Sequence, residues 1–396
     1  MVGDAPFTPA LNGTFAGFDF NPTVDRIRIV TSTGQNLRLN PETGTVAATD
    51  GNINGAAGAS VSGVAYTNSK AGAAATTLYD IDITTQKLYK QTPPNNGTLV
   101  EVGSLGVMPN GEAGFDISPD GTVALASMNV AGKSSLFQVD TLTGMAVKLG
   151  DFASAVNGIA IPTNPVAYAN DEMNNLLIFD PTTTGAPVSK MIAGLMVGEN
   201  ILGIDFRPLN GQLFALGSAG NLYTLNAASG AATITGAGSF GILNGTHFGF
   251  DFNPTVDRMR VVSNKGQNLR LNPLTGAIAA TDLNLNPGTP NVSGAAYANN
   301  FAGATTTTLF DIDCANDKLY KQMPPNDGVL VEVGALGINV ESNNGFDIGS
   351  TSGIAYALFT VGGNTSIYTI NLTTGAATKM MDFPNKVKGF TIGLGF

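Results

Sequence analysis

Short apolar runs that follow a glycine recur along the whole chain and set its pattern of hydrophobic and polar positions. Nine such glycines occur at intervals of 44 to 51 residues, leading runs such as GFDF, GIAI and GIDF. They are Gly17, Gly63, Gly114, Gly158, Gly203, Gly249, Gly294, Gly345 and Gly389. A period of this size, filled with short strands, is typical of β-propeller blades.

Each period contains signals for four short strands. The glycine-led run is expected to be the innermost strand, because it is apolar on both faces and blades pack on either side of it. Runs such as RIRIV and NLRLN follow as second and third strands, and AVKLG is an example of a fourth. Turns such as NPETG and DTLTG join the last two strands, with Asn or Asp as cap and glycine at the position of positive φ. The pattern predicts an all-β propeller of four-stranded antiparallel blades.

The number of blades and their closure have two solutions. Eight full periods precede the ninth glycine run, which favours one eight-bladed propeller over residues 1–396 with an internal repeat of about 231 residues. This solution leaves the last run, GFTIGLGF, without a blade. In the alternative, that run closes a five-bladed ring of residues 164–396, and residues 1–163 are a partial propeller copy.

The longest repeated motif carries a family resemblance. GFDFNPTVDRIRIVTSTGQNLRLNPETG begins at Gly17 and returns from Gly249 with 22 of 28 positions identical. Together with VSGAAYAN, TTTTLFDID and LGIDFRPLNGQLFALGSAGNLYTLN, it closely resembles a bacterial domain of unknown function, family 4394. Residues 164–396 resemble one full copy and residues 11–163 a copy without its N-terminal blades. The resemblance implies an exported, propeller-like repeat domain and carries neither an activity nor catalytic residues.

Composition limits the partners and the cellular locations that are expected for the protein. The formal net charge is −10, only 12% of residues are charged, and no basic patch is visible, so nucleic acid is not expected as a partner. No apolar run reaches 18 residues, so membrane insertion is not expected. The start, MVGDAPFTPA, has neither the charged nor the apolar region of a signal peptide. Low lysine content with abundant Asn, Thr and Gly favours a bacterial protein that is extracellular or on the cell surface.

Side chains that commonly perform catalysis are scarce. His247 is the only histidine and Cys314 the only cysteine, and no HExxH, CxxC, GxSxG or P-loop motif occurs. This disfavours transition-metal and triad enzymes. A hydrolase or lyase that works with carboxylates, and with Ca²⁺ as the one cofactor considered, stays open as an alternative; its substrate would be a polysaccharide or a lactone.

Five of the inner runs carry an aspartate two residues after the glycine. A ring of these carboxylates near the central channel could hold a cation or a polyhydroxylated ligand. Alternatively, each is buried and accepts hydrogen bonds from a turn of the neighbouring blade, which fixes the spacing of the blades. The aromatic neighbours Phe18 and Phe20 favour burial. The five residues are Asp19, Asp116, Asp205, Asp251 and Asp347.

Two DID motifs place carboxylates two residues apart, on one face of a strand. Such a pair could ligate Ca²⁺, although neither motif resembles an EF-hand loop. The alternative roles are turn capping and pairing with Lys87 or Lys318. The four aspartates are Asp80, Asp82, Asp311 and Asp313.

Six of the seven arginines lie in the two copies of the long motif: Arg26, Arg28, Arg38, Arg258, Arg260 and Arg270. Three neighbouring guanidinium groups need an anion. Asp19 and Asp25 are near enough in sequence to supply it within the blade, and Asp251 and Asp257 would repeat this in the second copy. The alternative is a binding site for an anion or an acidic sugar.

These observations predict a secreted or cell-surface propeller that is a non-enzymatic binding or scaffold module. It would recognise an unknown glycan or protein through the loops on one face of the ring, since loops carry specificity on such scaffolds. Homotypic assembly is a third hypothesis, because an unpaired inner strand at either terminus could pair with another copy of the chain.

Overall fold

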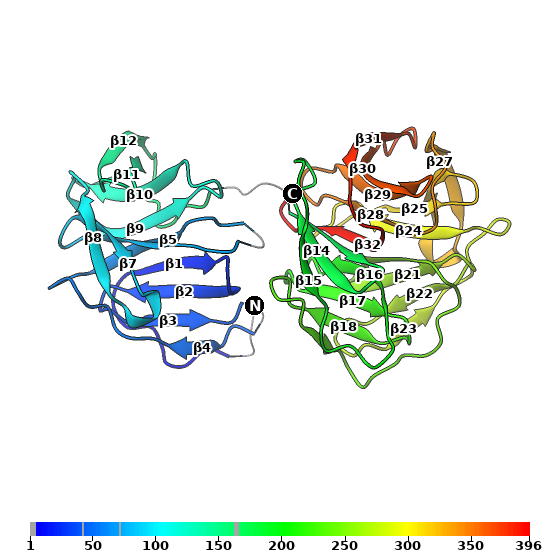
Figure 1. Ribbon diagram of the computed structural model, residues 1–396, viewed down its shortest axis with the longest axis horizontal. Helices are drawn as coiled ribbons and strands as arrows, with labels where there is room; N and C mark the ends of the chain where they lie inside the picture. The colour runs from blue at the N-terminus through cyan, green and yellow to red at the C-terminus, as the bar shows by residue number, and fades with distance from the viewer. Residues whose placement is uncertain (1–4, 42, 71–72, 162–165) are drawn as a thin grey trace. The chain divides into compact units, whose positions relative to one another are not determined.

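The structure is a computed structural model that describes residues 5–41, 43–70, 73–161 and 166–396. Across these residues the chain forms eight four-stranded antiparallel sheets, with two single-turn 3₁₀ helices, η1 (Pro94–Asn96) and η2 (Pro325–Asp327) (Figure 1). The predicted all-β fold of four-stranded blades is confirmed. Among the same residues, no helix has the length and apolar character needed to cross a lipid bilayer. The chain divides into two compact units, Met1–Asn164 and Pro165–Phe396.

The unit Met1–Asn164 contains three blades. The first has β1 (Ala16–Asn21), β2 (Arg26–Thr31), β3 (Asn36–Leu39) and β4 (Val46–Thr49). The second has β5 (Val61–Tyr66), β6 (Leu78–Asp82), β7 (Lys87–Gln91) and β8 (Leu99–Ser104). The third has β9 (Pro109–Ile117), β10 (Ala124–Val130), β11 (Lys133–Val139) and β12 (Ala146–Asp151). Their inner strands β1, β5 and β9 lie side by side in that order.

The unit Pro165–Phe396 contains five blades. The first has β13 (Ala167–Asp171), β14 (Asn175–Phe179) and β15 (Val188–Met191), and β32 (Val387–Ile392) completes it as the inner strand. The second has β16 (Ile201–Phe206), β17 (Leu213–Gly217), β18 (Leu222–Leu225) and β19 (Ala232–Ile234). The third has β20 (Phe248–Asn253), β21 (Arg258–Ser263), β22 (Asn268–Leu271) and β23 (Ile278–Thr281). The fourth has β24 (Val292–Tyr297), β25 (Leu309–Asp313), β26 (Lys318–Gln322) and β27 (Leu330–Ala335). The fifth has β28 (Asn344–Ile348), β29 (Ala355–Val361), β30 (Asn364–Ile370) and β31 (Ala377–Asp382).

The inner strands of the five-bladed unit form a closed cycle. β16, β20, β24 and β28 follow one another, and β32 lies between β28 and β16 (Figure 1). The eight predicted blades are therefore present, but they are not closed into the single ring that the period favoured. The last glycine run, which that solution left unassigned, pairs with β13 from Ala167↔Ile392 to Asn170↔Gly389.

Close packing of adjacent inner strands explains why glycine leads each apolar run. A Cβ atom placed on Gly249 would lie 2.6 Å from the Cβ of Ala295, and one on Gly203 would lie 2.8 Å from the Cβ of Phe250. No side chain fits at such distances without a shift of the backbone. At these two positions, the repeated glycine is thus a steric requirement of the blade centre.

The turns have the predicted capping chemistry, and the core lies between blades. In the turn after β22, Asn272 Oδ1 accepts a hydrogen bond from the backbone N–H of Leu274 at 2.9 Å, and Gly276 has a φ of 68°. Phe214 of one blade packs edge-on against Phe252 of the next, with ring centroids 5.2 Å apart. Each blade thereby buries an apolar face against its neighbour and holds the loops at its ends in place.

Candidate functional site

All five inner-strand aspartates bind the inner strand that follows them. Asp205 Oδ2 accepts a hydrogen bond from the backbone N–H of Phe252 at 2.7 Å, and Asp347 Oδ2 accepts one from Ile392 at 2.7 Å. The other three bonds join Asp19 to Tyr66, Asp116 to Ile161 and Asp251 to Tyr297. The donor is always three residues after the next glycine. Four of the donors lie on inner strands, and Ile161 lies in the run that follows Gly158, so none is on the turn that the sequence suggested. The register of neighbouring blades is therefore fixed by side chain to backbone bonds.

Three of these carboxylates meet at the centre of the five-bladed unit. Oxygen atoms of Asp205, Asp251 and Asp347 all lie within 4.8 Å of one another. Thr391 occupies the corresponding position on β32, and its hydroxyl lies 2.8 Å from Asp205 Oδ1 and 3.0 Å from Asp347 Oδ2. Among the residues described, this is the group whose oxygen ligands could hold a metal ion, and Ca²⁺ is the ion that such ligands suit.

Burial raises the pKa values of all three central carboxylates. It raises the pKa of Asp347 to about 6, and it raises the pKa values of Asp205 and Asp251 well above their usual range, with further increases from neighbouring carboxylates. Each of the three side chains is buried and already accepts a backbone hydrogen bond. The arrangement can hold blades together or enclose a small cation, but it offers no surface to a large substrate.

The arginines of the long motif bind a carboxylate that the sequence analysis missed. Arg28 is buried and donates to Asp50 Oδ2 at 2.6 Å, and Arg38 donates to both oxygens of Asp50 at 2.7 and 2.8 Å. Arg260, Arg270 and Asp282 repeat this in the second copy. The prediction of Asp19 and Asp25 as counter-ions of Arg28 and Arg38 was wrong, because β4 pairs with β3 and brings Asp50 beside them. The stretch AATD, present in both copies, is the signal that could have revealed it.

Neutral side chains complete the surroundings of the buried arginine. Arg28 also donates to Asn36, Asn95 and the Tyr66 hydroxyl, at 2.7, 2.8 and 3.2 Å. Burial alone would raise the pKa of Asp50, but hydrogen bonds from Arg38 and Arg28 outweigh it and hold that pKa below its usual value. With Tyr66 on the next blade, the cluster joins two blades and leaves the Arg28 guanidinium no free face for an anionic ligand.

The remaining arginine and aspartate of each motif have separate roles. Arg26 and Arg258 each donate to the backbone carbonyl of the residue before them, at 2.6 and 2.7 Å. In the five-bladed unit, Asp257 accepts two hydrogen bonds from Arg207, at 2.8 and 2.5 Å. Asp257 therefore ties its blade to the preceding blade and does not neutralise Arg260.

The DID motifs divide into a buried acid and a turn cap. Asp82 Oδ1 accepts backbone hydrogen bonds from Ser60, Thr84 and Thr85, which confirms turn capping for this position. Asp313 Oδ1 likewise accepts bonds from residues 315 and 316. The predicted pairing with lysine was wrong: Lys87 and Lys318 bind Glu101 and Glu332 on the adjacent outer strands.

The first aspartate of each motif is enclosed between blades. Asp80 and Asp311 are buried, and among the described residues no group donates a hydrogen bond to either carboxylate. Burial raises the pKa of Asp311 to about 8 despite the nearby positive charge of Arg260. The structure does not bring the two aspartates of a motif to an exposed site where an ion from solvent would bind.

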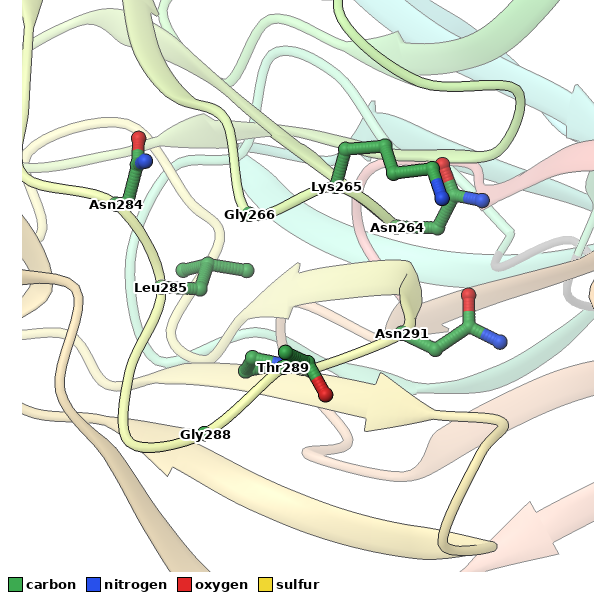
Figure 2. A pocket seen from close by; sticks show the side chains of 9 residues that line it. Asn264, Lys265, Gly266, Asn284, Leu285, Gly288, Thr289 and Asn291 are labelled. Atoms are coloured by element: carbon green, nitrogen blue, oxygen red, sulfur yellow. The ribbon is translucent and has the colours of Figure 1, made fainter.

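A hollow of about 570 Å³ lies between the third and fourth blades of the five-bladed unit (Figure 2). The hairpin between β21 and β22 forms one side with Asn264, Lys265 and Gly266, and the connection from β23 to β24 forms the other. The lining residues on that connection are Asn284, Leu285, Gly288, Thr289, Pro290 and Asn291. The residues of this hollow carry no sequence motif, so the hollow was not predicted.

The two loops around the hollow are held to each other. The backbone N–H of Leu285 donates to the carbonyl of Gly266 at 2.9 Å, and Gly266 adopts a φ of 77° that suits glycine. The exposed side chains of Lys265 and Thr289 make no hydrogen bond within the described part of the chain, and neither does that of Asn291. The hollow therefore presents amide, hydroxyl and ammonium groups on a fixed frame.

The single histidine and the single cysteine are not arranged for catalysis. His247 Nδ1 lies 2.9 Å from the hydroxyl of Thr246, and burial lowers the pKa of the imidazole. Cys314 Sγ lies 2.8 Å from Ser293 Oγ, and burial raises the pKa of the thiol to about 11, so little reactive thiolate is present at neutral pH.

Comparisons with known proteins give a family and little else. The family described as "Domain of unknown function (DUF4394)" matches residues 1–160 and again residues 175–392. No protein with a curated description matches the chain. Among solved structures, the crystal structure of the computationally designed Ika8 protein is similar to this chain, with 9% sequence identity and a TM-score of 0.27. The similarity covers 92% of this chain and 99% of the Ika8 chain.

Proposed function

Since the chain belongs to the family of domain of unknown function DUF4394, which states no activity, we propose a function from its own residues: a non-enzymatic binding module that recognises a glycan. The proposed site is the hollow between Asn264–Gly266 and Asn284–Asn291. The observation that carries the proposal is the lining of this hollow by amide, hydroxyl and ammonium groups.

The size and chemistry of the hollow suit a sugar. Its volume of about 570 Å³ lies within the usual range of ligand pockets, roughly 300–1,000 Å³. Amide side chains both donate and accept hydrogen bonds, as sugar hydroxyls do, and the two partners can therefore pair in several ways. Lys265 adds a positive charge in a strongly acidic chain, which favours an oligosaccharide with carboxylate groups.

The carboxylates support a scaffold role for the blade centres. Asp205, Asp251 and Asp347 are buried and bind neighbouring inner strands, so a polysaccharide has no access to them. A carboxylate-dependent hydrolase or lyase is the less supported alternative for this reason. A glycan ligand is consistent with a protein located outside the cell or on its surface, where glycans are abundant.

The N-terminal copy offers an internal comparison. Ser32, Thr33 and Ser60 stand where the second copy has Asn264, Lys265 and Asn291. The amides of Asn264 and Asn291 and the ammonium group are thus missing from the equivalent loops, whereas Asn52 keeps the amide of Asn284. The proposal therefore predicts one ligand per chain, although the blades themselves are present twice.

The test combines a glycan array with calorimetry on the best neutral and acidic oligosaccharides. We expect a stoichiometry of one and a loss of about tenfold or more in affinity for Lys265→Thr with Asn291→Ser, since about 1.4 kcal/mol is tenfold. Both substitutions introduce the residues of the N-terminal copy, which that fold accepts. Matched controls are Thr33→Ala and Ser60→Ala, which should leave binding unchanged. Unaltered affinity in the double variant would refute the site.

A further inference from the structure

The same sequence is buried in one unit and exposed in the other. Phe250 and Phe252 of β20 are 6% and 0% exposed, whereas Phe18 and Phe20 of β1 are 55% and 49% exposed. Both pairs stand in the motif GFDFNPTVDR. The nearby Val24 and Val256 are equally exposed in the two copies, at 51% and 54%, so the difference is specific to the inner strand.

In the five-bladed unit, the blade β16–β19 covers this face. Phe214 packs against Phe252, and Gly203 lets β16 approach Phe250 closely. Arg207 of the covering blade binds Asp257, and Asp205 accepts the backbone N–H of Phe252. The covering blade therefore supplies an aromatic side chain, a guanidinium group and a carboxylate at defined positions.

The N-terminal copy keeps the residues that this covering blade recognises. Phe18 and Phe20 correspond to Phe250 and Phe252, and Asp25 corresponds to Asp257. The backbone N–H of Phe20 donates to Asp19, the adjacent residue of its own strand, at 2.7 Å. In the second copy the equivalent N–H binds the preceding blade instead.

The opposite end of the three-bladed unit is open as well. Residues 158–161 lie beside β9, since Ile161 donates its N–H to Asp116 at 2.6 Å. A Cβ on Gly158 would meet no atom of the described residues within 4 Å, whereas one on the equivalent Gly389 would lie 2.7 Å from Gly203 Cα. In the five-bladed unit, β13–β15 and β16–β19 connect these two ends.

We infer that the unit Met1–Asn164 is a docking surface for a partner of defined chemistry, a two-bladed segment like residues 166–235. The surface has two open ends, one at Phe18 and Phe20 of β1 and the other at Gly158. The β1 end accepts the aromatic and the carboxylate of such a segment as β20 accepts those of β16–β19. The inference is independent of the glycan proposal, because none of its residues lines the hollow.

The test uses Phe18→Trp as a reporter, since the chain contains no tryptophan. A second copy of residues 166–236 is fused ahead of residue 5 of the full chain through a flexible linker. We expect the tryptophan emission to shift to the blue and acrylamide quenching to be lost, relative to the unfused chain. In the matched control, Phe214→Ser and Arg207→Ser are placed only in the added segment, and the emission should stay that of an exposed indole.

Three outcomes would overturn the inference. The tryptophan could remain exposed in the fusion, or be buried already in the unfused chain. It could also become buried with rising concentration while sedimentation shows a dimer, which would make a second copy the occupant. Hydrogen exchange of residues 16–21 in a fusion without the reporter provides a second readout, and unchanged exchange there would likewise refute the docking surface.

Discussion

At the scale of single residues, two aspartates of the five-bladed unit have pKa values shifted in opposite directions, because arginines donate hydrogen bonds to only one of them. Asp282 is held by Arg260 and Arg270, and their hydrogen bonds lower its pKa despite its burial. Asp311, near the same arginine but without a hydrogen bond from any described residue, has its pKa raised to about 8. One carboxylate is therefore stabilising when charged, and the other when neutral.

Asp311→Asn should make folding less dependent on pH. A folded pKa of about 8 lies above the usual value of 3.8, so the folded state binds more protons than the unfolded state between these values. The stability from the protonated Asp311 is fully present below the unfolded pKa and is lost as pH rises through the folded pKa. We expect the variant to lose less stability than the parent between about pH 4 and pH 8, as measured by chemical denaturation.

Asp282→Asn is the contrasting variant. The lowered pKa of Asp282 in the parent means that the charged carboxylate stabilises the fold above the unfolded pKa. This stability is lost as pH falls through the folded pKa. The variant should be destabilised at neutral pH and approach the parent in acid. Parallel pH profiles for both variants would contradict these assignments.

At the scale of elements, the space around the leading glycine differs from one inner strand to another. Gly249 lies against Ala295 of the next inner strand, whereas a methyl group added to Gly158 would have no atom within 4 Å in the part of the chain that the structure describes. Both glycines occupy the same place in the repeat. The sequence period therefore marks equivalent positions whose packing is not equivalent.

Gly249→Ala should destabilise the protein, and Gly158→Ala should not. The added methyl group at residue 249 would lie 2.6 Å from the Cβ of Ala295, and overpacking of this kind costs about 1–3 kcal/mol. Thermal unfolding of the two variants measures the difference. Equal melting temperatures would show that the inner strands can separate without cost.

Local patterns made the elements predictable from sequence, because apolar runs, caps and glycines act over a few residues. The turn NPLTG after β22 has the capping expected of the repeated turns, with Asn272 as cap and Gly276 at positive φ. The counter-ion Asp50 was missed because pairing of β3 with β4, and not nearness in sequence, brings it to Arg38. The hollow at Lys265 was missed because its two sides come from separate loops without a motif.

At the scale of the whole chain, a single strand decides how the blades close. β32 joins the sheet of β13–β15 and lies between β28 and β16. Counting periods could not reveal this, because the period gives the number of inner strands and not the partner of the last one. The correct partner depends on a contact between distant parts of the chain.

Removal of residues 387–396 should open the five-bladed unit. Without β32, β13 loses its pairing partner on one side from Ala167 to Asn170 and becomes an edge strand that is held only by β14. We expect hydrogen exchange of residues 167–171 to accelerate strongly, while residues 61–66 of β5, in the other unit, exchange as before. Unchanged exchange at residues 167–171 would show that another strand fills this position.

The late position of β32 also bears on biosynthesis. A ribosome releases β13–β15 first and supplies their fourth strand only after every other strand of the unit has been made. During that time the edge of β13 is a template for pairing with any extended chain nearby. The order of the strands therefore leaves this edge of the nascent five-bladed unit unpaired until β32 has been made, and exposes it to pairing errors during that time.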